Sequence, residues 1–432
     1  MRPAARIQTA IEILERLGQG QVPADRLMAA AFRRSRFIGS KDRRSIRDLV
    51  YAVIRSRARL AARLASCGAE PSARALVIAH LAIATRETPG SLFDGSAHAP
   101  APLDGGEADM AAGLSHFHDD IDLPLPVRLE VPDWLEAPLR ASFGENFERE
   151  MSALNAEAPV DLRVNGLKSD RETELAALRE DGVEAEPVPH APLGIRLGAR
   201  LTLGNHASFQ EGRIEVQDEG SQIAALLADA KPGMTVIDFC AGAGGKTLAL
   251  AAAMGGKGRL FACDTDGRRL GELQMRAEGA GIGAMLSYRA LASGDDPWLA
   301  EHAGTADLVL VDAPCSGIGA WRRSPDARWL LNADRLAEYR DMQADILPRA
   351  AALVKPGGRL VYVTCSLLAE ENAAQVEAFL ASHPAFGILD LAAQVSALGL
   401  PPAAVRQGMV TLSPATTATD GFFIAAMGRR DG

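Results

Sequence analysis

The stretch Ala306-Asp-Leu-Val-Leu-Val-Asp-Ala-Pro-Cys-Ser-Gly-Ile-Gly319 decides the fold that we expect for this chain. Its apolar run, residues 308–311, predicts a short buried strand. Pro314 cannot extend a central strand, and the two glycines after it allow a tight turn. The strand therefore ends in a turn that presents Asp312 and Cys315 together.

A second stretch repeats this arrangement further along the chain. Residues 357–366 (GGRLVYVTCS) also predict a strand that ends in a thiol, Cys365. In a parallel sheet the carboxyl ends of the strands lie along one edge, where open α/β sheets bind their ligands. We therefore expect Cys315 and Cys365 to face one pocket.

Strand and helix patterns alternate from residue 232 onward. Alternation predicts right-handed crossovers and a doubly wound, mostly parallel sheet, that is, a Rossmann-like α/β domain. The tail predicts a closing antiparallel hairpin from residues 407–413 and 421–427. The expected strands are residues 235–241, 258–264, 284–289, 307–315 and 359–365, and the expected helices are residues 246–254, 268–278, 334–354 and 371–381.

Three regions precede this domain, which we expect to span residues 213–432. Apolar residues recur at helical spacing in residues 1–88, which predicts an all-helical domain. Residues 89–126 are rich in Pro, Gly, Asp and Ser and predict a linker with one short helix near residues 107–114. Residues 127–212 combine strand and helix patterns and predict a small α+β module.

Composition narrows the class of protein. The 432 residues are 47% hydrophobic and 23% charged, as in ordinary globular chains, and no apolar run is long enough to span a membrane. Five cysteines without a C-x-x-C pair favour a reducing cytoplasm over a disulfide framework. We expect a cytoplasmic monomer. His116 and His118 lie in a polar loop without further ligands at metal-like spacing, so we expect no metal site.

Charge is distributed unevenly along the chain. The formal net charge is −9, yet residues 33–63 contain eleven Lys or Arg residues and only two acidic ones. A local basic face on an acidic chain suits a polyanion such as RNA. A solvated helical surface without a partner is the alternative.

A glycine-rich turn follows the first expected strand of the α/β domain, in residues 238–247 (DFCAGAGGKT). Glycines allow a tight turn and the close approach of a ligand to the backbone. Asp264 ends the next strand, where an acid can bind ribose hydroxyls. A phosphate-binding Walker A loop would need glycine at the position of Cys240. The turn leaves NAD and S-adenosylmethionine open as ligands.

The two thiols favour S-adenosylmethionine. A dehydrogenase does not need a Pro-Cys turn and a Thr-Cys turn on neighbouring strands. An enzyme that methylates a pyrimidine at C5 does need thiols. That carbon becomes nucleophilic only after a thiolate adds at C6, and a base must later remove the C5 proton so that the thiol can leave.

The motifs in residues 238–247, 312–317 and 364–372 resemble those of the RsmB/Sun family of RNA 5-methylcytosine methyltransferases. The resemblance covers about residues 216–427, with three motifs in the family's order and spacing. It implies a class I methyltransferase domain that uses S-adenosyl-L-methionine. More loosely, residues 1–88 are similar to the family's NusB-like RNA-binding domain, and residues 127–212 to its RNA-recognition-motif-like subdomain.

The resemblance also implies roles for single residues. Cys365 would be the nucleophile at C6, Cys315 would assist release of the product, and Asp312 would bind the cytosine edge. Lys246 would lie near the reacting groups, and Asp264 would bind the cofactor's ribose. The expected cofactor-binding residues are Cys240, Ala241, Gly242, Ala243, Gly244, Gly245, Lys246, Asp264 and Asp312. A small apolar residue at a strand end is the alternative reading of each thiol.

Two departures from the family pattern stand out. The family has proline where this chain has Ala243, which we expect to loosen the glycine turn without removing its backbone donors. The family often has an acid after the third strand, for which Asp295 is a weakly aligned candidate.

Residues 321–329 (WRRSPDARW) follow the Pro-Cys turn. Tryptophans interleaved with arginines can stack a splayed base and hold phosphates. A lid packed by its own tryptophans is the equal alternative.

These features together predict an RNA cytosine-C5 methyltransferase, with ribosomal RNA as the expected substrate. One rival is a DNA cytosine-C5 methyltransferase with Cys315 as nucleophile, which would leave the Thr-Cys motif unexplained. The other is a non-catalytic RNA-binding or ribosome-assembly factor. The target cytosine, the form in which the RNA is presented and the oligomeric state stay open.

Overall fold

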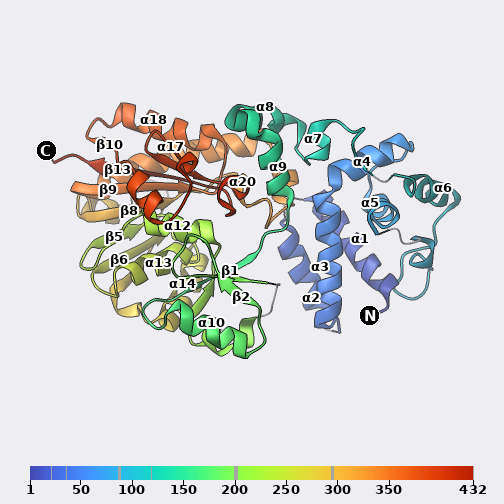
Figure 1. The fold of residues 1–432 in the computed structure, drawn as a ribbon, viewed down its shortest axis with the longest axis horizontal. Helices are drawn as coiled ribbons and strands as arrows, with labels where there is room; N and C mark the ends of the chain where they lie inside the picture. Colours follow the sequence, from blue (N-terminus) through green and yellow to red (C-terminus); the bar gives the residue numbers. More distant parts are fainter. Residues whose placement is uncertain are drawn as a thin grey trace. The chain divides into compact units, whose positions relative to one another are not determined.

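The computed structural model describes residues 1–432 except Gln21, Arg36, residues 86–88, His118, residues 199–202, residues 293–295 and Gly432. The chain forms two compact units. One consists of Met1–Ala156 with Trp321–Asn332, and the other of Glu157–Ala320 with Ala333–Gly432. Figure 1 shows the helices of Met1–Ala156 in blue to teal and the strands of the second unit in green to red.

The first unit is built from helices, which confirms the predicted helical start of the chain. Helix α1 shows why, because its buried residues Ile7, Ile11 and Leu14 recur at the spacing of one helix face. The helices are α1 (Pro3–Gln19), α2 (Ala24–Arg34), α3 (Ser40–Arg55), α4 (Arg57–Ser66), α5 (Ala73–His80), α6 (Gly105–Leu114), α7 (Leu125–Arg128), α8 (Asp133–Phe143), α9 (Phe147–Asn155) and the short α16 (Ala327–Leu330). Helix α6 lies in the predicted linker, where we expected one short helix.

The second unit begins with a small antiparallel sheet in the order β2-β3-β1-β4. Its elements are β1 (Val160–Val164), α10 (Arg171–Glu180), β2 (Ala185–Pro187), β3 (Gly194–Leu197), α11 (Ala207–Gln210) and β4 (Ile214–Val216). The predicted α+β module is confirmed. Helices α8 and α9, which we assigned to this module, belong to the first unit by their contacts. The division of the chain into four domains therefore stays a proposal.

The large sheet has nine strands in the order β11-β12-β13-β9-β8-β5-β6-β7, and β10 pairs with β13. Its strands are β5 (Thr235–Asp238), β6 (Arg259–Asp264), β7 (Leu286–Ala290), β8 (Ala306–Asp312), β9 (Val354–Thr364), β10 (Phe386–Ile388), β11 (Val405–Arg406), β12 (Met409–Leu412) and β13 (Phe422–Arg429). The helices between them are α12 (Glu219–Leu227), α13 (Gly245–Ala253), α14 (Gly267–Ala280), α15 (Pro297–Glu301), α17 (Ala333–Leu353), α18 (Ala373–Ser382), α19 (Ala392–Ala397) and α20 (Pro414–Thr417).

The five strands β7, β6, β5, β8 and β9 are parallel, whereas β13 runs antiparallel to β9, and β12 runs antiparallel to β13. The strand order reverses between β5 and β8, which is the position where open α/β sheets bind ligands. Both faces of the sheet are buried. In β8, Leu308 and Leu310 belong to the core on one face, and Val309 and Val311 to the core on the other. The predicted doubly wound sheet with a closing hairpin is confirmed.

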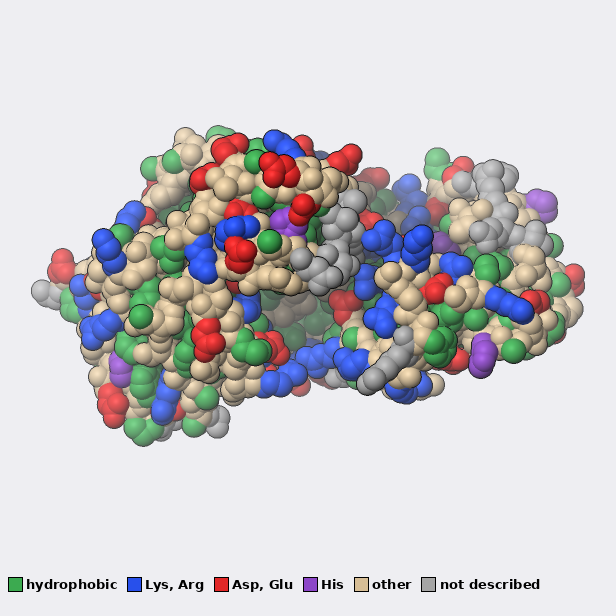
Figure 2. Space-filling view, turned by 90° about the horizontal axis from the view of Figure 1, so that it is seen from below, with side chains coloured by type: hydrophobic (Ala, Val, Ile, Leu, Met, Phe, Trp, Pro, Cys, Tyr) green, Lys and Arg blue, Asp and Glu red, His purple; other side chains and the backbone are tan. Residues whose placement is uncertain are grey.

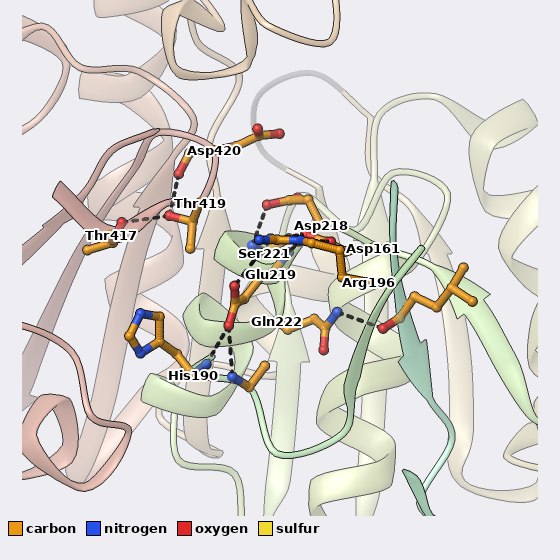
Figure 3. A network of polar contacts seen from close by, with 12 residues as sticks. Asp161, His190, Arg196, Asp218, Glu219, Ser221, Gln222, Thr417, Thr419 and Asp420 are labelled. Atoms are coloured by element: carbon orange, nitrogen blue, oxygen red, sulfur yellow. Dashed lines mark hydrogen bonds and ion pairs between the residues drawn. The ribbon is translucent and has the colours of Figure 1, made fainter. Parts of the chain in front are cut away.

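A buried polar network joins the small sheet to helix α12 within the second unit (Figure 3). Glu219, in the first turn of α12, is completely buried and accepts hydrogen bonds from the backbone N–H groups of His190 and Ala191, at 2.6 and 3.1 Å. Arg196 on β3 binds both carboxylate oxygens of Asp161 on β1, at 2.8 and 3.0 Å. Asp161 in turn accepts from the backbone N–H of Glu219 at 3.2 Å. The small sheet is therefore held against α12, the helix that precedes the first strand of the large sheet.

Among the residues that the structure describes, no helix is both long enough and apolar enough to cross a membrane.

Candidate active site

The two predicted thiols lie side by side. Strands β8 and β9 are parallel neighbours, with Asp312 paired to Val363, so the turns after both strands meet at one edge of the sheet. The Sγ atoms of Cys315 and Cys365 are 3.4 Å apart. The pattern of strand ends thus predicted the meeting of the two cysteines, although they are distant in the sequence.

The two thiols are not equivalent. The hydrogen bond with Cys365, burial and the negative charge of Glu371 raise the pKa of the Cys315 thiol well above its usual range. Cys315 therefore keeps its proton at neutral pH and can donate a hydrogen bond to the sulfur of Cys365. A hydrogen bond of this kind stabilises a neighbouring sulfur atom that carries negative charge.

An ion pair stands beside the thiols. Lys246, in the first turn of α13, is buried, and its Nζ donates a hydrogen bond to Oδ2 of Asp312 at 2.8 Å. Burial opposes the charged form of Lys246, but the charge and the hydrogen bond of Asp312 outweigh it and raise the pKa of Lys246. The ammonium also lies 5.1 Å from the ring centre of Phe422. The Asp312 side chain is 34% exposed, so a substrate can reach it.

The glycine turn connects β5 to α13. Gly242 and Gly244 have φ angles of 56° and 85°, which side chains with a Cβ rarely adopt. A Cβ at Gly242 would collide with the guanidinium of Arg269, and one at Gly244 with Leu273. The backbone N–H of Gly242 donates to Oδ2 of Asp264 at 2.7 Å, so the turn and the end of β6 are joined.

Comparison with known proteins identifies the family. A model described as 16S rRNA methyltransferase RsmB/F matches residues 225–428, and one described as an RsmF/B-like ferredoxin-like domain matches residues 131–203. The probable ribosomal RNA small subunit methyltransferase B of Synechocystis sp. is 33% identical over 314 residues, which cover 71% of this chain and 68% of that protein. The chain belongs to the RsmB/F methyltransferase family.

Further relatives agree with this assignment. Ribosomal RNA small subunit methyltransferase B of Sodalis glossinidius is 34% identical over 299 residues, which cover 68% of this chain but 65% of that protein, just under two thirds of its length. The crystal structure of PH0851 has a TM-score of 0.80 at 27% identity and covers 99% of both chains. A methyltransferase homologue from Pyrococcus horikoshii has a TM-score of 0.59 at 27% identity, over 71% of this chain and 97% of that one.

S-adenosyl-L-methionine is the cofactor of the RsmB/F methyltransferases, and the residues at this sheet edge fit it. The turn of Cys240, Ala241, Gly242, Ala243 and Gly244 leaves no room for side chains at its two positive-φ glycines, and Gly245 and Lys246 begin helix α13. The N–H groups of a first helical turn suit a carboxylate such as that of the methionine end. The predicted cofactor is confirmed, and the role of each residue toward it stays a proposal.

Asp264 retains the capacity to bind a ribose. Its Oδ1 accepts from the backbone N–H of Asp266 at 2.8 Å, and its Oδ2 from Gly242. Each carboxylate oxygen has a second acceptor site, so hydroxyl groups can still bind. These two contacts hold the carboxylate in place beside the glycine turn.

The expected loosening of the turn at Ala243 is offset by a contact from α14. The guanidinium of Arg276 donates a hydrogen bond to the carbonyl oxygen of Ala243 and pairs with Glu215 at 3.2 Å. Ala243 stands where the family has proline, so an arginine on the next helix restrains this part of the backbone.

The candidate for the family's acid after the third strand is Asp295. Asp295 lies outside the described residues. Its neighbour Asp296 caps α15 and accepts from the backbone of Ala292 and Trp298 and from Arg289, which together lower the pKa of Asp296 to about 2. Its carboxylate is thus engaged within the fold.

Of the two interpretations of residues 321–329, a base-stacking loop and a segment packed by its own tryptophans, the burial of two side chains favours the second. Trp321 and Arg328 are each 1% exposed, and the guanidinium of Arg328 lies 4.7 Å from the ring centre of Trp321. Arg328 also donates to the carbonyl oxygens of Glu130 and Leu154. The segment packs into the first unit, where Arg328 donates to these acceptors and the indole N–H of Trp329 donates to the carbonyl oxygen of Ile54 at 3.1 Å.

Fewer basic residues of the segment 33–63 are exposed than its charge suggests. Arg63 is 2% exposed and pairs with Asp120 and Asp122, and Arg59 pairs with Glu130 at 2.9 Å. Arg55 donates to the carbonyl oxygen of Arg322 at 2.6 Å. These arginines are engaged by acceptors within the first unit. Among the described residues of the segment, which leave out Arg36, the exposed basic ones are Arg33, Arg34, Lys41 and Arg44 on α2 and α3, and Arg57.

Sequence reasoning missed one residue of the site, Glu371. It is completely buried behind the two cysteine turns, whereas its neighbour Glu370 pairs with Arg340 near the surface at 2.7 Å. Two adjacent glutamates give no local signal of which one is buried, so only the packing distinguishes them.

Proposed function

We propose that this protein methylates C5 of a cytosine in RNA, with small-subunit ribosomal RNA as the substrate. The observation that supports this best is the contact of 3.4 Å between the sulfur atoms of Cys315 and Cys365, beside the pair of Lys246 and Asp312. A methyltransferase that acts on oxygen or nitrogen has no use for two thiols at this position. The relatives named as ribosomal RNA methyltransferases support the choice of RNA.

Each of these residues has a separate role in the proposed reaction. The thiolate of Cys365 adds to C6 of the base, and the C5–C6 double bond opens so that C5 becomes nucleophilic. The cofactor, when bound, supplies the methyl group to C5. Asp312 accepts hydrogen bonds from the exocyclic amine of cytosine and is held in place by Lys246. A base then takes the C5 proton, the C6–S bond breaks, and the electron pair leaves with the sulfur of Cys365 beside the S–H of Cys315.

The same geometry argues against the DNA-type assignment of the nucleophile. In that chemistry Cys315 would attack, and Cys365, whose sulfur lies 3.4 Å away, would have no role. Cys315 is better suited to donate a hydrogen bond to Cys365 as that sulfur departs.

The four exposed basic residues of α2 and α3, Arg33, Arg34, Lys41 and Arg44, would contact the RNA backbone. We call them the α2–α3 basic patch. Figure 2 shows Lys and Arg side chains close together in its right-hand half. Such contacts give affinity without sequence specificity, so they would position the RNA while the site selects the base.

The decisive experiment compares Cys315→Ala and Cys365→Ala with the wild type. Each protein is incubated with cellular RNA and labelled S-adenosylmethionine and then run on a denaturing gel. We expect Cys315→Ala to accumulate a covalent protein–RNA adduct, because addition proceeds and release stalls. Cys365→Ala should give neither adduct nor methyl transfer.

The other outcomes are equally informative. An adduct with Cys365→Ala alone would make Cys315 the nucleophile. RNA binding without methyl transfer or adduct in any of the three proteins would favour a non-catalytic RNA-binding factor.

A further inference from the structure

A buried carboxylate lies directly behind the two thiols. Glu371 is completely buried in the short turn Ala369–Glu371. Its Oε1 accepts hydrogen bonds from the backbone N–H of Ser316 at 2.8 Å and from the side-chain amide of Gln343 at 3.1 Å. Its Oε2 accepts from the hydroxyl groups of Ser316 and Ser366. We call these four residues the Glu371 cluster.

The partners of Glu371 are the chain neighbours of the thiols. Ser316 follows Cys315, and Ser366 follows Cys365. The two serine hydroxyl groups are also 3.1 Å apart. One carboxylate therefore joins the turn after β8 to the turn after β9, one residue away from each sulfur atom.

Gln343 and Asn372 extend this connection. Gln343 on α17 donates to the carbonyl oxygen of Pro314 at 2.9 Å as well as to Glu371. Asn372 donates to the carbonyl oxygen of Ser366 at 2.9 Å. The residues just before Cys315 and just after Cys365 are thus restrained from two further elements.

The burial of the Glu371 carboxylate has an energetic cost that other interactions must offset. In the described part of the chain no Lys or Arg forms an ion pair with Glu371, and burying a charge is costly unless hydrogen bonds compensate. Here the four donors compensate. An apolar residue could fill the same space without this cost, but it could not hold both turns.

We infer that Glu371 is a positioning residue that sets the separation and the direction of the Cys315 and Cys365 thiols. The consequence for methyl transfer rests on the proposed function. The geometric consequence does not, because the separation of the two sulfur atoms can be tested in protein without RNA.

The test uses Glu371→Gln, which keeps the shape of the side chain but removes the charge and turns one acceptor into a donor. RNA-free protein is treated with diamide, which takes two hydrogen atoms from the two thiols and joins them as a disulfide. The Cys315–Cys365 peptide is then quantified by mass spectrometry. In the wild type the sulfur atoms need only close from 3.4 Å to bonding distance, about 2.05 Å. We expect the disulfide to form about tenfold more slowly in the variant, since a loss of alignment lowers the effective concentration of one thiol toward the other.

The second readout is catalysis. In single-turnover methyl transfer we expect Glu371→Gln to be about 100-fold slower than the wild type, the effect of a misplacement of about 1 Å. The Kd for S-adenosylmethionine, measured by calorimetry, should stay unchanged. A merely structural role would slow methyl transfer, raise the Kd for S-adenosylmethionine and lower the thermal stability together.

Glu370→Gln is the matched control. It makes the same chemical change one position earlier, where the side chain is 32% exposed and pairs with Arg340. We expect wild-type rates of oxidation and methyl transfer.

Two further variants guard against misfolding of Glu371→Gln. Ser316→Ala and Ser366→Ala each remove one hydroxyl group and leave the carboxylate in place, and each should slow disulfide formation by a smaller factor. Wild-type oxidation rates in folded Glu371→Gln, or in both serine variants if Glu371→Gln does not fold, would overturn the inference. If the wild type forms the disulfide readily but methylates no RNA, the proposed function fails while the oxidation rates still decide the role of Glu371.

Discussion

The guanidinium of Arg276 on α14 donates a hydrogen bond to the backbone carbonyl oxygen of Ala243, in the middle of the glycine turn. Arg276 is oriented for this contact by Glu215, which also pairs with Arg163 at 2.8 Å. The turn that would hold the methionine end of the cofactor is therefore restrained by a side chain from a neighbouring helix.

Arg276→Ala should weaken cofactor binding. The turn would lose one charge-assisted hydrogen bond, so we expect the Kd for S-adenosylmethionine to rise about tenfold, or about 1.4 kcal/mol. Isothermal titration calorimetry measures it directly. Arg268→Ala is the control, because Arg268 lies on the same helix and is 69% exposed. Equal affinities of the two variants would contradict the role of Arg276.

Asp238→Asn should change the pH dependence of stability. Burial above all, with the charges of Asp312 and Asp264, raises the pKa of Asp238 to about 7, although the hydroxyl of Thr247 and the charge of Lys246 act in the opposite direction. The unfolded chain has a pKa of about 3.9 at this position. The folded state therefore binds the proton more tightly, and its stabilising effect is complete below about pH 4 and lost as the pH rises to 7.

Urea unfolding at several pH values between 4 and 8 provides the measurement. The free energy of unfolding of the wild type, relative to that of Asp238→Asn, should fall by up to about 1.4 kcal/mol for each pH unit in this window. Parallel curves for the two proteins would show that Asp238 does not titrate between these pH values.

Arg328→Ala should destabilise the first unit. Arg328 donates hydrogen bonds to Glu130, Asn155 and Leu154 from a position that is 1% exposed. Its removal would leave these buried acceptors unsatisfied and create a cavity beside Trp321, so we expect a loss of about 3 kcal/mol in the free energy of unfolding. Arg44→Ala, an exposed residue of the same unit, should change it by less than about 0.5 kcal/mol. A neutral Arg328→Ala would show that the segment is not anchored there.

The α2–α3 basic patch should contribute to RNA affinity in a salt-dependent way. Replacing its four residues with alanine removes contacts to phosphates, and each lost contact should lower the slope of log K against log[salt] by about 0.7. The slope is measured by filter binding of ribosomal RNA fragments at salt concentrations from about 50 to about 300 mM. Lys257→Ala, an exposed change in the second unit, is the control. An unchanged slope would place the RNA contacts elsewhere.

The local pattern of the sequence was enough to predict the sheet and the positions of the reacting groups. Alternating strand and helix periods predicted the doubly wound order, because buried parallel strands read as short apolar runs and their connections as helices. Asp312, Cys315 and Cys365 follow the ends of neighbouring strands, so the topology by itself brings them to one edge. Both predictions follow from the spacing of apolar residues and from the order of strands and helices along the chain, which are read directly from the sequence.

Burial and pairing of single polar residues were decided only by the tertiary structure. Glu370 and Glu371 are chemically identical neighbours, yet one is near the surface and the other binds four donors behind the thiols. Trp321 and Arg328 have the composition of a base-stacking loop but are buried in the first unit. The physical reason is that a charge or an aromatic ring is buried when distant segments supply its partners, and those partners are known only once the chain has folded.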